Sequence, residues 1–171
     1  SRRARLRHVS EVEIGPPRPG DLGWLIGLHG RWYAANKGFS LQFEWTVARI
    51  VADVAPRLAP PLVTMLVARD GDGPLATLTA DGEDVDEAGR GHIRIVIAEP
   101  RAQGRGLGHR LLAMGLANLR AASLPGAYLD TFARLDAARA VYEKAGFRLV
   151  REEMGGTWGT PVAEQRFELD F

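Results

Sequence analysis

The fold of this chain is decided by the stretch Arg94-Ile-Val-Ile-Ala-Glu-Pro-Arg-Ala-Gln-Gly-Arg-Gly-Leu-Gly-His-Arg-Leu-Leu112. An apolar strand is expected over 93–98, and Glu99 and Pro100 end it. The glycine-rich segment 103–108 follows and leads into an apolar helix. Glycines between a strand and a helix let backbone N–H groups surround an anion, and the helix N-terminus adds about half a positive charge. The stretch therefore predicts a phosphate or pyrophosphate site.

The loop does not match the two best-known phosphate motifs. The Gly-Lys-Ser/Thr ending of nucleotide-triphosphate loops is absent. The dinucleotide pattern GxGxxG fails at its third glycine, where His109 stands. That pattern also normally follows the first strand of its domain, whereas here a long segment precedes it. Further positive character at the loop comes from basic side chains, namely Arg101, Arg105, His109 and Arg110.

Hydrophobic periodicity and Gly/Pro breakers predict the remaining elements. Strands are expected over 9–14, 62–69, 75–80, 93–98, 128–130, 148–152 and 163–171. Helices are expected over 21–35, 41–54, 104–121 and 136–144, with Asp21 as the first N-cap and Gly146 closing the last helix. This order predicts one mixed α/β (α+β) domain with about seven strands and helices on both faces of the sheet.

Composition excludes several classes of protein. The chain has 171 residues, 46% of them hydrophobic, and no cysteine, which excludes disulfides, a thiolate nucleophile and Cys-ligated metals. Histidine spacing suggests no metal site. The longest apolar stretch, 58–68, is too short to span a membrane. We expect a cytoplasmic protein without membrane contact.

Charge is distributed unevenly along the chain. Four arginines lie among the first seven residues, so the rest of the chain is mildly acidic although the net charge is +1. An acidic body argues against direct nucleic-acid binding by this chain. We therefore divide the chain into a basic arm or linker over 1–8 and a domain over 9–171.

The 94–112 stretch resembles the central motif of the GCN5-related N-acetyltransferases (GNAT), in which a Gln/Arg-x-x-Gly-x-Gly/Ala loop holds the pyrophosphate of acetyl-CoA. Gln103, Gly106 and Gly108 match its three positions. Downstream, the segment 140–147 is similar to the second cofactor motif of the family, and the predicted order of elements over 9–171 also fits. The resemblance implies a mostly antiparallel sheet whose central strand splays from its neighbour.

The resemblance also implies which residues hold acetyl-CoA. They are the backbone of Ile97 and Ala98, the loop and helix residues Gln103, Gly104, Arg105, Gly106, Leu107, Gly108, His109 and Arg110, and later Ala138 and Tyr142. Tyr142 matches the usual general acid, since a phenol can protonate a leaving thiolate while staying neutral at pH 7. Phe132 stands where the family often has a cofactor-contacting asparagine, with Thr131 and Arg134 as substitutes.

The sequence offers several candidates for the general base. His29 shares a helix face with Tyr33, and Glu99 follows the central strand. His92, near the start of that strand, and Glu44 are alternatives, as is a water relay.

The acceptor side is indicated by aromatic residues. Six of the thirteen aromatic side chains lie within 24–45. Most are expected in the core, and the rest to line a pocket for a small apolar or aromatic amine. The candidate substrate residues are His29, Tyr33, Phe39, Trp45, His92 and Trp158.

We therefore expect an N-acetyltransferase that transfers acetyl from acetyl-CoA to a small-molecule amine or amino acid, as a monomer or homodimer. The alternatives are a non-catalytic acyl-CoA sensor and a protein-lysine acetyltransferase, for which the acidic loop 81–87 would be the groove. The segments 20–24, 29–30, 32–34 and 167–171 also resemble acetyltransferase domains fused behind MarR-type winged-helix regulators. That resemblance implies that the basic arm links this domain to a DNA-binding domain.

Overall fold

The computed structural model describes residues 11–171. The predicted basic arm 1–8 and the start of the first predicted strand lie outside these residues. The strands are β1 (Glu13–Gly15), β2 (Val63–Asp70), β3 (Gly73–Asp81), β4 (Gly91–Ala98), β5 (Gly126–Phe132), β6 (Arg148–Gly155) and β7 (Val162–Asp170). The helices are α1 (Asp21–Lys37), α2 (Leu41–Val54), α3 (Leu107–Ala121) and α4 (Asp136–Lys144), with short 3₁₀ turns η1 (Ala55–Arg57) and η2 (Pro100–Ala102).

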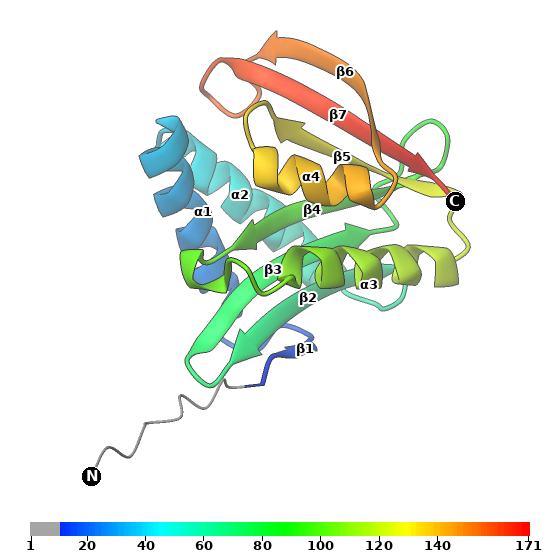
Figure 1. Cartoon of the computed structure of the whole chain (residues 1–171), viewed down its shortest axis with the longest axis horizontal. Coiled ribbons are helices and arrows are strands. Elements are labelled where there is room, and N and C mark those ends of the chain that lie inside the picture. The colour runs from blue at the N-terminus through cyan, green and yellow to red at the C-terminus, as the bar shows by residue number, and fades with distance from the viewer. Residues whose placement is uncertain (1–10) are drawn as a thin grey trace.

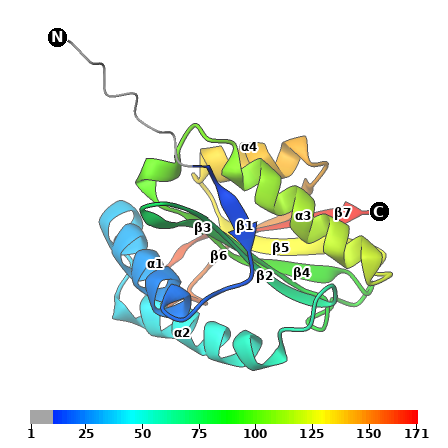
Figure 2. The same cartoon turned by 90° about the horizontal axis from the view of Figure 1, so that it is seen from below.

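One sheet with the strand order β1-β2-β3-β4-β5-β7-β6 forms the centre of the domain. Every neighbouring pair is antiparallel except β4 and β5, which run parallel. Figure 2 shows α3 and α4 on one face of the sheet and α1 and α2 on the other. The predicted class, a mixed seven-stranded sheet between helices, is confirmed.

The sheet divides between β4 and β5. These strands pair only at Gly91↔Ala127 and His92↔Tyr128, after which they separate (Figure 1). The separation begins beside a bulge in β4, where Ile95 has a φ of 56° and the register against β3 shifts. A β-bulge bends the strand that carries it. We call this opening between β4 and β5 the fork.

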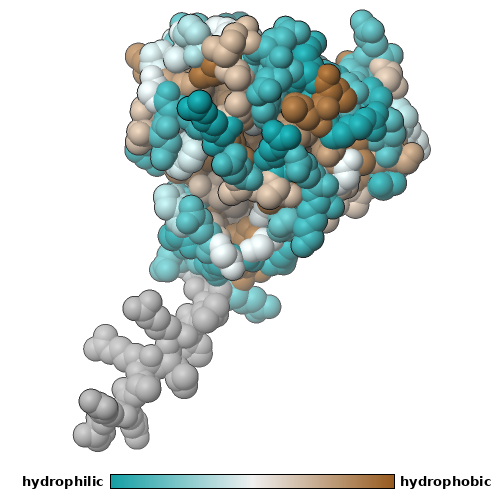
Figure 3. Space-filling view, turned by 45° about the horizontal axis from the view of Figure 1, so that its top comes forward, coloured by the Kyte–Doolittle hydropathy of each residue, from teal (hydrophilic) through white to brown (hydrophobic). Residues whose placement is uncertain are grey.

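Each face of the sheet has its own apolar core. Under α3 and α4 the core contains Leu78, Leu111 and Phe167, while under α1 and α2 it contains Leu25 and Phe43. Burial on both faces explains why the central strands read as apolar runs in the sequence. Hydrophilic side chains cover most of the outer face seen in Figure 3, and the hydrophobic patches there are small.

Two helix starts differ from the expectation. The N-cap of α1 is Gly20, in the left-handed region, while Asp21 lies inside the helix. The Asp21 carboxylate accepts hydrogen bonds from the Arg18 backbone N–H and the Arg69 guanidinium, so it joins α1 to β2. Helix α3 begins at Leu107 rather than at residue 104, because glycine φ angles of +75° and +67° keep the preceding loop out of the helix. No helix over 11–171 combines the length and apolarity that a membrane crossing requires.

Candidate active site

The predicted anion loop lies between η2 and α3. Gly104 and Gly106 have φ angles of +75° and +67°, a conformation that glycine adopts readily and other residues do not. A Cβ at either position would meet nothing within 4 Å, so the space above the loop is open. Helix α3 has no side-chain cap at its N-terminus, and its first N–H groups have no partner within the helix. These donors fit a pyrophosphate.

Two of the arginines predicted at this loop are turned toward the β2–β3 hairpin. Arg101 and Arg105 both donate hydrogen bonds to the carboxylate of Asp70, at 2.9–3.0 Å. His109 and Arg110 lie exposed on the first turn of α3. The positive character at the loop therefore comes from the helix terminus and these two side chains, with Arg101 and Arg105 largely compensated.

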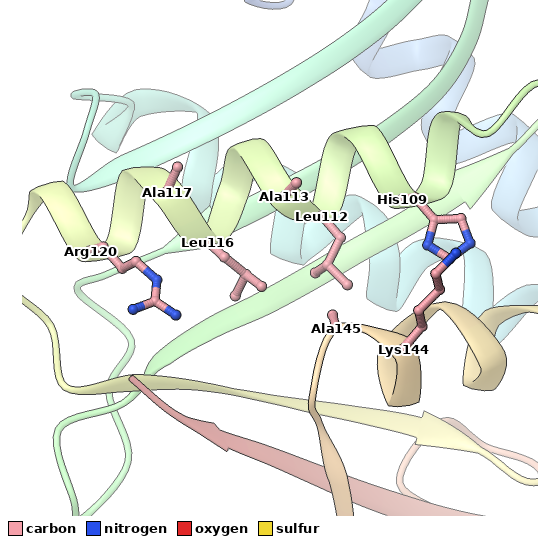
Figure 4. A pocket seen from close by; sticks show the side chains of 8 residues that line it. All are labelled: His109, Leu112, Ala113, Leu116, Ala117, Arg120, Lys144 and Ala145. Carbon is pink, nitrogen blue, oxygen red and sulfur yellow. The ribbon is translucent and has the colours of Figure 1, made fainter.

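A groove of about 420 Å³ continues from the loop between α3 and α4. Figure 4 shows His109 and Lys144 pointing toward each other at one end, with Leu112 and Leu116 along the wall and Arg120 at the far end. Basic groups over an apolar wall suit a phosphate-bearing, partly apolar ligand. Ala138 lies half-buried on α4 and packs against the core beneath.

The fork leaves one edge of β4 without a partner strand. Ile97 and Ala98 are paired with Thr77 and Ala76 of β3, and the N–H of Glu99 donates to the carbonyl of Leu75 at 2.7 Å. Successive N–H groups of a strand point to opposite edges, so the N–H of Ala98 faces the fork. An extended ligand arm could pair with β4 along this edge.

Tyr142 lies on α4, which covers the same face of the sheet as α3 (Figure 2). Its side chain is buried against Phe147 and Phe167, with ring centroids 6.1 Å away in each case. Burial raises the pKa of Tyr142 to about 12, so the phenol stays protonated. Tyr33, from the opposite face of the sheet, has its pKa raised by burial and further by Tyr142.

His29 lies in an aromatic cluster under α1 and α2. Its Nδ1 lies 2.7 Å from the carbonyl oxygen of Leu25, and its ring stacks on Tyr33 at 6.2 Å. Burial lowers the pKa of His29 to about 4, so the ring is neutral at pH 7. The cluster also contains Phe39, Phe43, Phe132 and Trp158. Most of the aromatic side chains predicted at the acceptor therefore contribute to the core. Phe132, which was expected at the cofactor in place of an asparagine, packs in the same cluster.

Two further predicted residues lie apart from this cluster. Trp45 is 46% exposed on α2, where the Arg49 guanidinium lies 5.9 Å from its ring centre. Glu99 accepts a hydrogen bond of 2.7 Å from the indole N–H of Trp24, which ties α1 to the end of β4. Trp45 and Glu99 therefore each contact another side chain, Arg49 and Trp24 respectively.

His92 stands at the base of the fork, on the last pair of residues that joins β4 to β5. Its Nδ1 donates to the Asp84 carboxylate at 2.8 Å, and its Nε2 lies 3.8 Å from a carboxylate oxygen of Asp130. The ring stacks on Tyr128 at 4.3 Å. Asp84 belongs to the acidic loop between β3 and β4, eight residues before His92, whereas Asp130 reaches His92 through the pairing of β4 with β5.

The loop that carries Asp84 is held in place by neighbouring strands. Arg94 donates to Asp84 at 2.9 Å, and the Tyr128 hydroxyl donates to the backbone carbonyl of Asp84 at 3.1 Å. Fully buried Asp81 accepts two hydrogen bonds from Arg57. His92 lowers the pKa of Asp84, so this carboxylate is charged and orients the imidazole.

A second cavity, of about 240 Å³, is lined in part by Asp130, whose carboxylate lies 3.8 Å from Nε2 of His92. Its lining is mostly polar and consists of Asp130, Thr131, Arg151, Glu153, Thr157, Trp158, Glu164 and Gln165. Glu164 is held by the backbone N–H and hydroxyl of Thr157, at 3.0 Å each. Carboxylates outnumber the single arginine, so this cavity favours a polar, cationic molecule. Over residues 11–171 no cluster of three or more His, Asp or Glu side chains could hold a metal ion.

Comparison with known proteins agrees with this geometry. Residues 31–147 match the model of the acetyltransferase (GNAT) family, and the chain belongs to that family. Mycothiol acetyltransferase of Acidothermus cellulolyticus is 31% identical over 91% of this chain. The chain spans about half (48%) of that relative's length. Mycothiol acetyltransferase of Streptomyces avermitilis is 43% identical, over 36% of this chain and 20% of its own length.

Solved structures share the fold at low identity. An acetyltransferase of the GNAT family from Staphylococcus aureus superposes with a TM-score of 0.71 at 12% identity, covering 94% of this chain and 99% of its own. The acetyltransferase yncA of Salmonella typhimurium, solved with acetyl-CoA, superposes with a TM-score of 0.66 at 12% identity, covering 93% of each chain. At these identities the likeness concerns the fold alone.

Proposed function

We propose that this chain transfers the acetyl group of acetyl-CoA to the amine of a polar small molecule. The observation that carries the proposal is the combination of an uncapped helix N-terminus behind a glycine loop with a fork that opens beside it. Family membership supports acetyl transfer, and the names of the mycothiol acetyltransferases support a small-molecule acceptor. Two structural neighbours were solved with acetyl-CoA, which supports that donor.

Acetyl-CoA fits the donor side of the site. Its pyrophosphate would be bound by the backbone N–H groups of the loop and the first turn of α3, beside His109 and Arg110. The groove between α3 and α4, with Lys144, has the mixed apolar and basic lining that a nucleotide portion needs. The edge of β4 at Ala98 would pair with the amide-containing arm. Bound there, the cofactor supplies an activated thioester to the centre of the sheet.

Tyr142 is proposed to protonate the leaving thiolate. The phenol is buried, and its raised pKa of about 12 keeps the proton on the oxygen at every pH at which the enzyme would work. It lies on the α4 side of the sheet, which is also the side of the loop and groove. A proton donor on this side of the sheet would lie near the sulfur of the thioester rather than near the attacking amine.

His92 is proposed to accept the proton of the attacking amine. Because Nδ1 donates to Asp84, the lone pair of the neutral ring is on Nε2, which is directed toward Asp130 and the polar cavity. This histidine–carboxylate arrangement fixes the tautomer and stabilises the imidazolium that forms. His29 lacks this orientation, since its ring is enclosed by aromatic side chains.

The polar cavity that Asp130 lines is proposed to hold the acceptor. Its carboxylates and hydroxyl groups favour an amine that carries a second cationic or hydroxyl group. The aromatic residues that suggested an apolar amine pack instead among themselves. We therefore replace that expectation with a polar acceptor.

A thiol-release assay with a matched panel of amines tests the function. The panel pairs each polar amine, such as an amino sugar or diamine, with an apolar amine of similar size. We expect CoA release above the no-amine rate with the polar members. Stabilisation by acetyl-CoA without release on any amine would instead support the alternative, a non-catalytic acyl-CoA sensor. Fusion to a MarR-type regulator, a cytoplasmic location and the oligomeric state stay predictions.

A further inference from the structure

Asp70 is a buried carboxylate that the proposed mechanism does not use. It ends β2 at the hairpin to β3, and its side chain is 4% exposed. Arg105 above all, with Asp72 and Arg101, lowers the pKa of Asp70 to about 2, so the side chain is charged at any assay pH. A buried charge of this kind requires compensation from specific partners.

The partners of Asp70 come from η2 and the glycine loop, which are 31 and 35 residues away in sequence. Arg101 donates to both oxygens of Asp70 at 3.0 Å, and to the carbonyls of Gly73 and Pro74 at 3.1 and 3.3 Å. Arg105 donates to Asp70 at 2.9 Å. Five hydrogen bonds therefore join the hairpin to the loop.

Arg101 precedes the two glycines of the loop that have positive φ angles, and Arg105 lies between them. Gly104 and Gly106 adopt positive φ angles, and glycine loses more conformational freedom on ordering than any other residue. Their Cα atoms have open space on the side where a Cβ would point. Ala102, at the end of η2, is buried, while Gly104 and Gly106 are exposed. The hydrogen bonds of Asp70 to Arg101 and Arg105 therefore join this exposed segment to the hairpin.

We propose that Asp70 is a positioning residue for the acetyl-CoA pyrophosphate, acting through Arg101 and Arg105 on the shape of the loop. The proposal rests on acetyl-CoA being the donor. It assigns the two arginines a role different from the direct phosphate contact that their position in the motif suggests. A preorganised loop binds more tightly, since less conformational entropy is lost on binding.

The direction of the change in acetyl-CoA affinity when Asp70 is replaced separates a positioning role from charge repulsion alone. A carboxylate near a phosphate site repels the anion, so its removal should tighten binding if only the field matters. If Asp70 shapes the loop, its removal should weaken binding. The two accounts predict opposite changes for one substitution.

The experiment is calorimetric titration of the full chain with acetyl-CoA, together with steady-state kinetics. For Asp70→Asn we expect the Kd and KM for acetyl-CoA to rise about tenfold, with kcat at saturating acetyl-CoA within about twofold of wild type. Asp72→Asn is the matched control, since it removes a charge from the same turn, and should change Kd less than about twofold. Thermal unfolding checks that each variant is folded.

A second variant removes the contacts without changing charge. Arg101→Lys cannot reproduce the four hydrogen bonds of the guanidinium, so we expect acetyl-CoA to bind about fivefold more weakly. Wild-type affinity in Asp70→Asn or Arg101→Lys, or tighter binding in Asp70→Asn, would overturn the proposal. If the wild-type chain itself does not bind acetyl-CoA, the proposed function fails as well, so the two failures are distinguishable.

Discussion

Nδ1 of His92 lies 2.8 Å from a carboxylate oxygen of Asp84, at the last point where β4 and β5 are paired. Asp84 comes from the loop between β3 and β4, and His92 is the second residue of β4, so the contact is formed within one hairpin. Nε2 of His92 lies 3.8 Å from the carboxylate of Asp130, which lines the cavity proposed for the acceptor. In this arrangement Asp84 orients the ring of His92.

Replacing His92 should slow turnover by removing the proton acceptor. We expect His92→Gln to lower kcat about 100-fold and Asp84→Asn about tenfold, within the usual range for general-base catalysis. The deficit should shrink when the acceptor is a weakly basic amine, which is already neutral at the assay pH. Glu83→Gln, in the same loop, is the control. An equal deficit with weakly and strongly basic amines would remove His92 from the proton transfer.

Tyr142→Phe should lower kcat without weakening the binding of acetyl-CoA. The substitution keeps the ring that packs on Phe147 and Phe167 and deletes only the proton donor. We expect kcat to fall about 10- to 100-fold and the Kd of acetyl-CoA to stay within about twofold. Tyr33→Phe, which removes a phenol on the other face of the sheet, serves for comparison. Unchanged turnover at saturating substrate would exclude the assigned role.

The glycines of the loop should differ in their tolerance of alanine. Gly106 has a φ of +67°, so Gly106→Ala should cost about 1 kcal/mol in stability and weaken acetyl-CoA binding. Gly108 lies inside α3, and a Cβ there would be 3.6 Å from Val141, an ordinary contact. Gly108→Ala should therefore leave stability unchanged or raise it by up to about 1 kcal/mol. Urea unfolding of both variants measures the difference, and equal destabilisation would contradict it.

His29 should make the fold less stable in acid. Its pKa is about 4 in the folded chain and close to 6.5 when exposed, so the unfolded chain binds the proton more readily. The stabilising effect of the neutral ring is complete above pH 6.5 and is lost as the pH falls toward 4. At pH 5 the loss is about 2 kcal/mol.

The variant His29→Phe isolates this effect, because it keeps an aromatic ring in the cluster without a titrating group. Urea unfolding at pH 7 and pH 5 should show a smaller drop in the free energy of unfolding for the variant than for wild type. The same drop in both proteins would mean that His29 does not control this part of the acid sensitivity.

Much of the fold was predictable from local patterns. Periodicity located α2 and α4 to the residue, and it placed the β2–β3 hairpin and the strand before the glycine loop within two residues. The left-handed φ of Gly146 follows from its position after a helix. These features depend on neighbouring residues, which is why a single sequence reveals them.

The fork and the polar cavity depend on contacts between residues that are far apart in the sequence. Ile95 adopts a positive φ that nothing in its residue type suggests. Asp70 meets Arg101 across 31 residues, and His92 meets Asp130 only because β4 and β5 are neighbours. Aromatic spacing likewise could not separate a pocket from a core, since the same rings at 24–45 would suit both. Side-chain partners of this kind follow from topology rather than from periodicity.

The central claim is acetyl transfer to a polar amine at the fork. The most direct measurement is mass spectrometry of the amine after incubation with acetyl-CoA and the chain, alongside quantification of released CoA. We expect an N-acetylated polar amine and CoA released in equal amounts, both strongly reduced in Tyr142→Phe and His92→Gln. Unmodified amines across the polar panel, or product formed equally well by both variants, would contradict it.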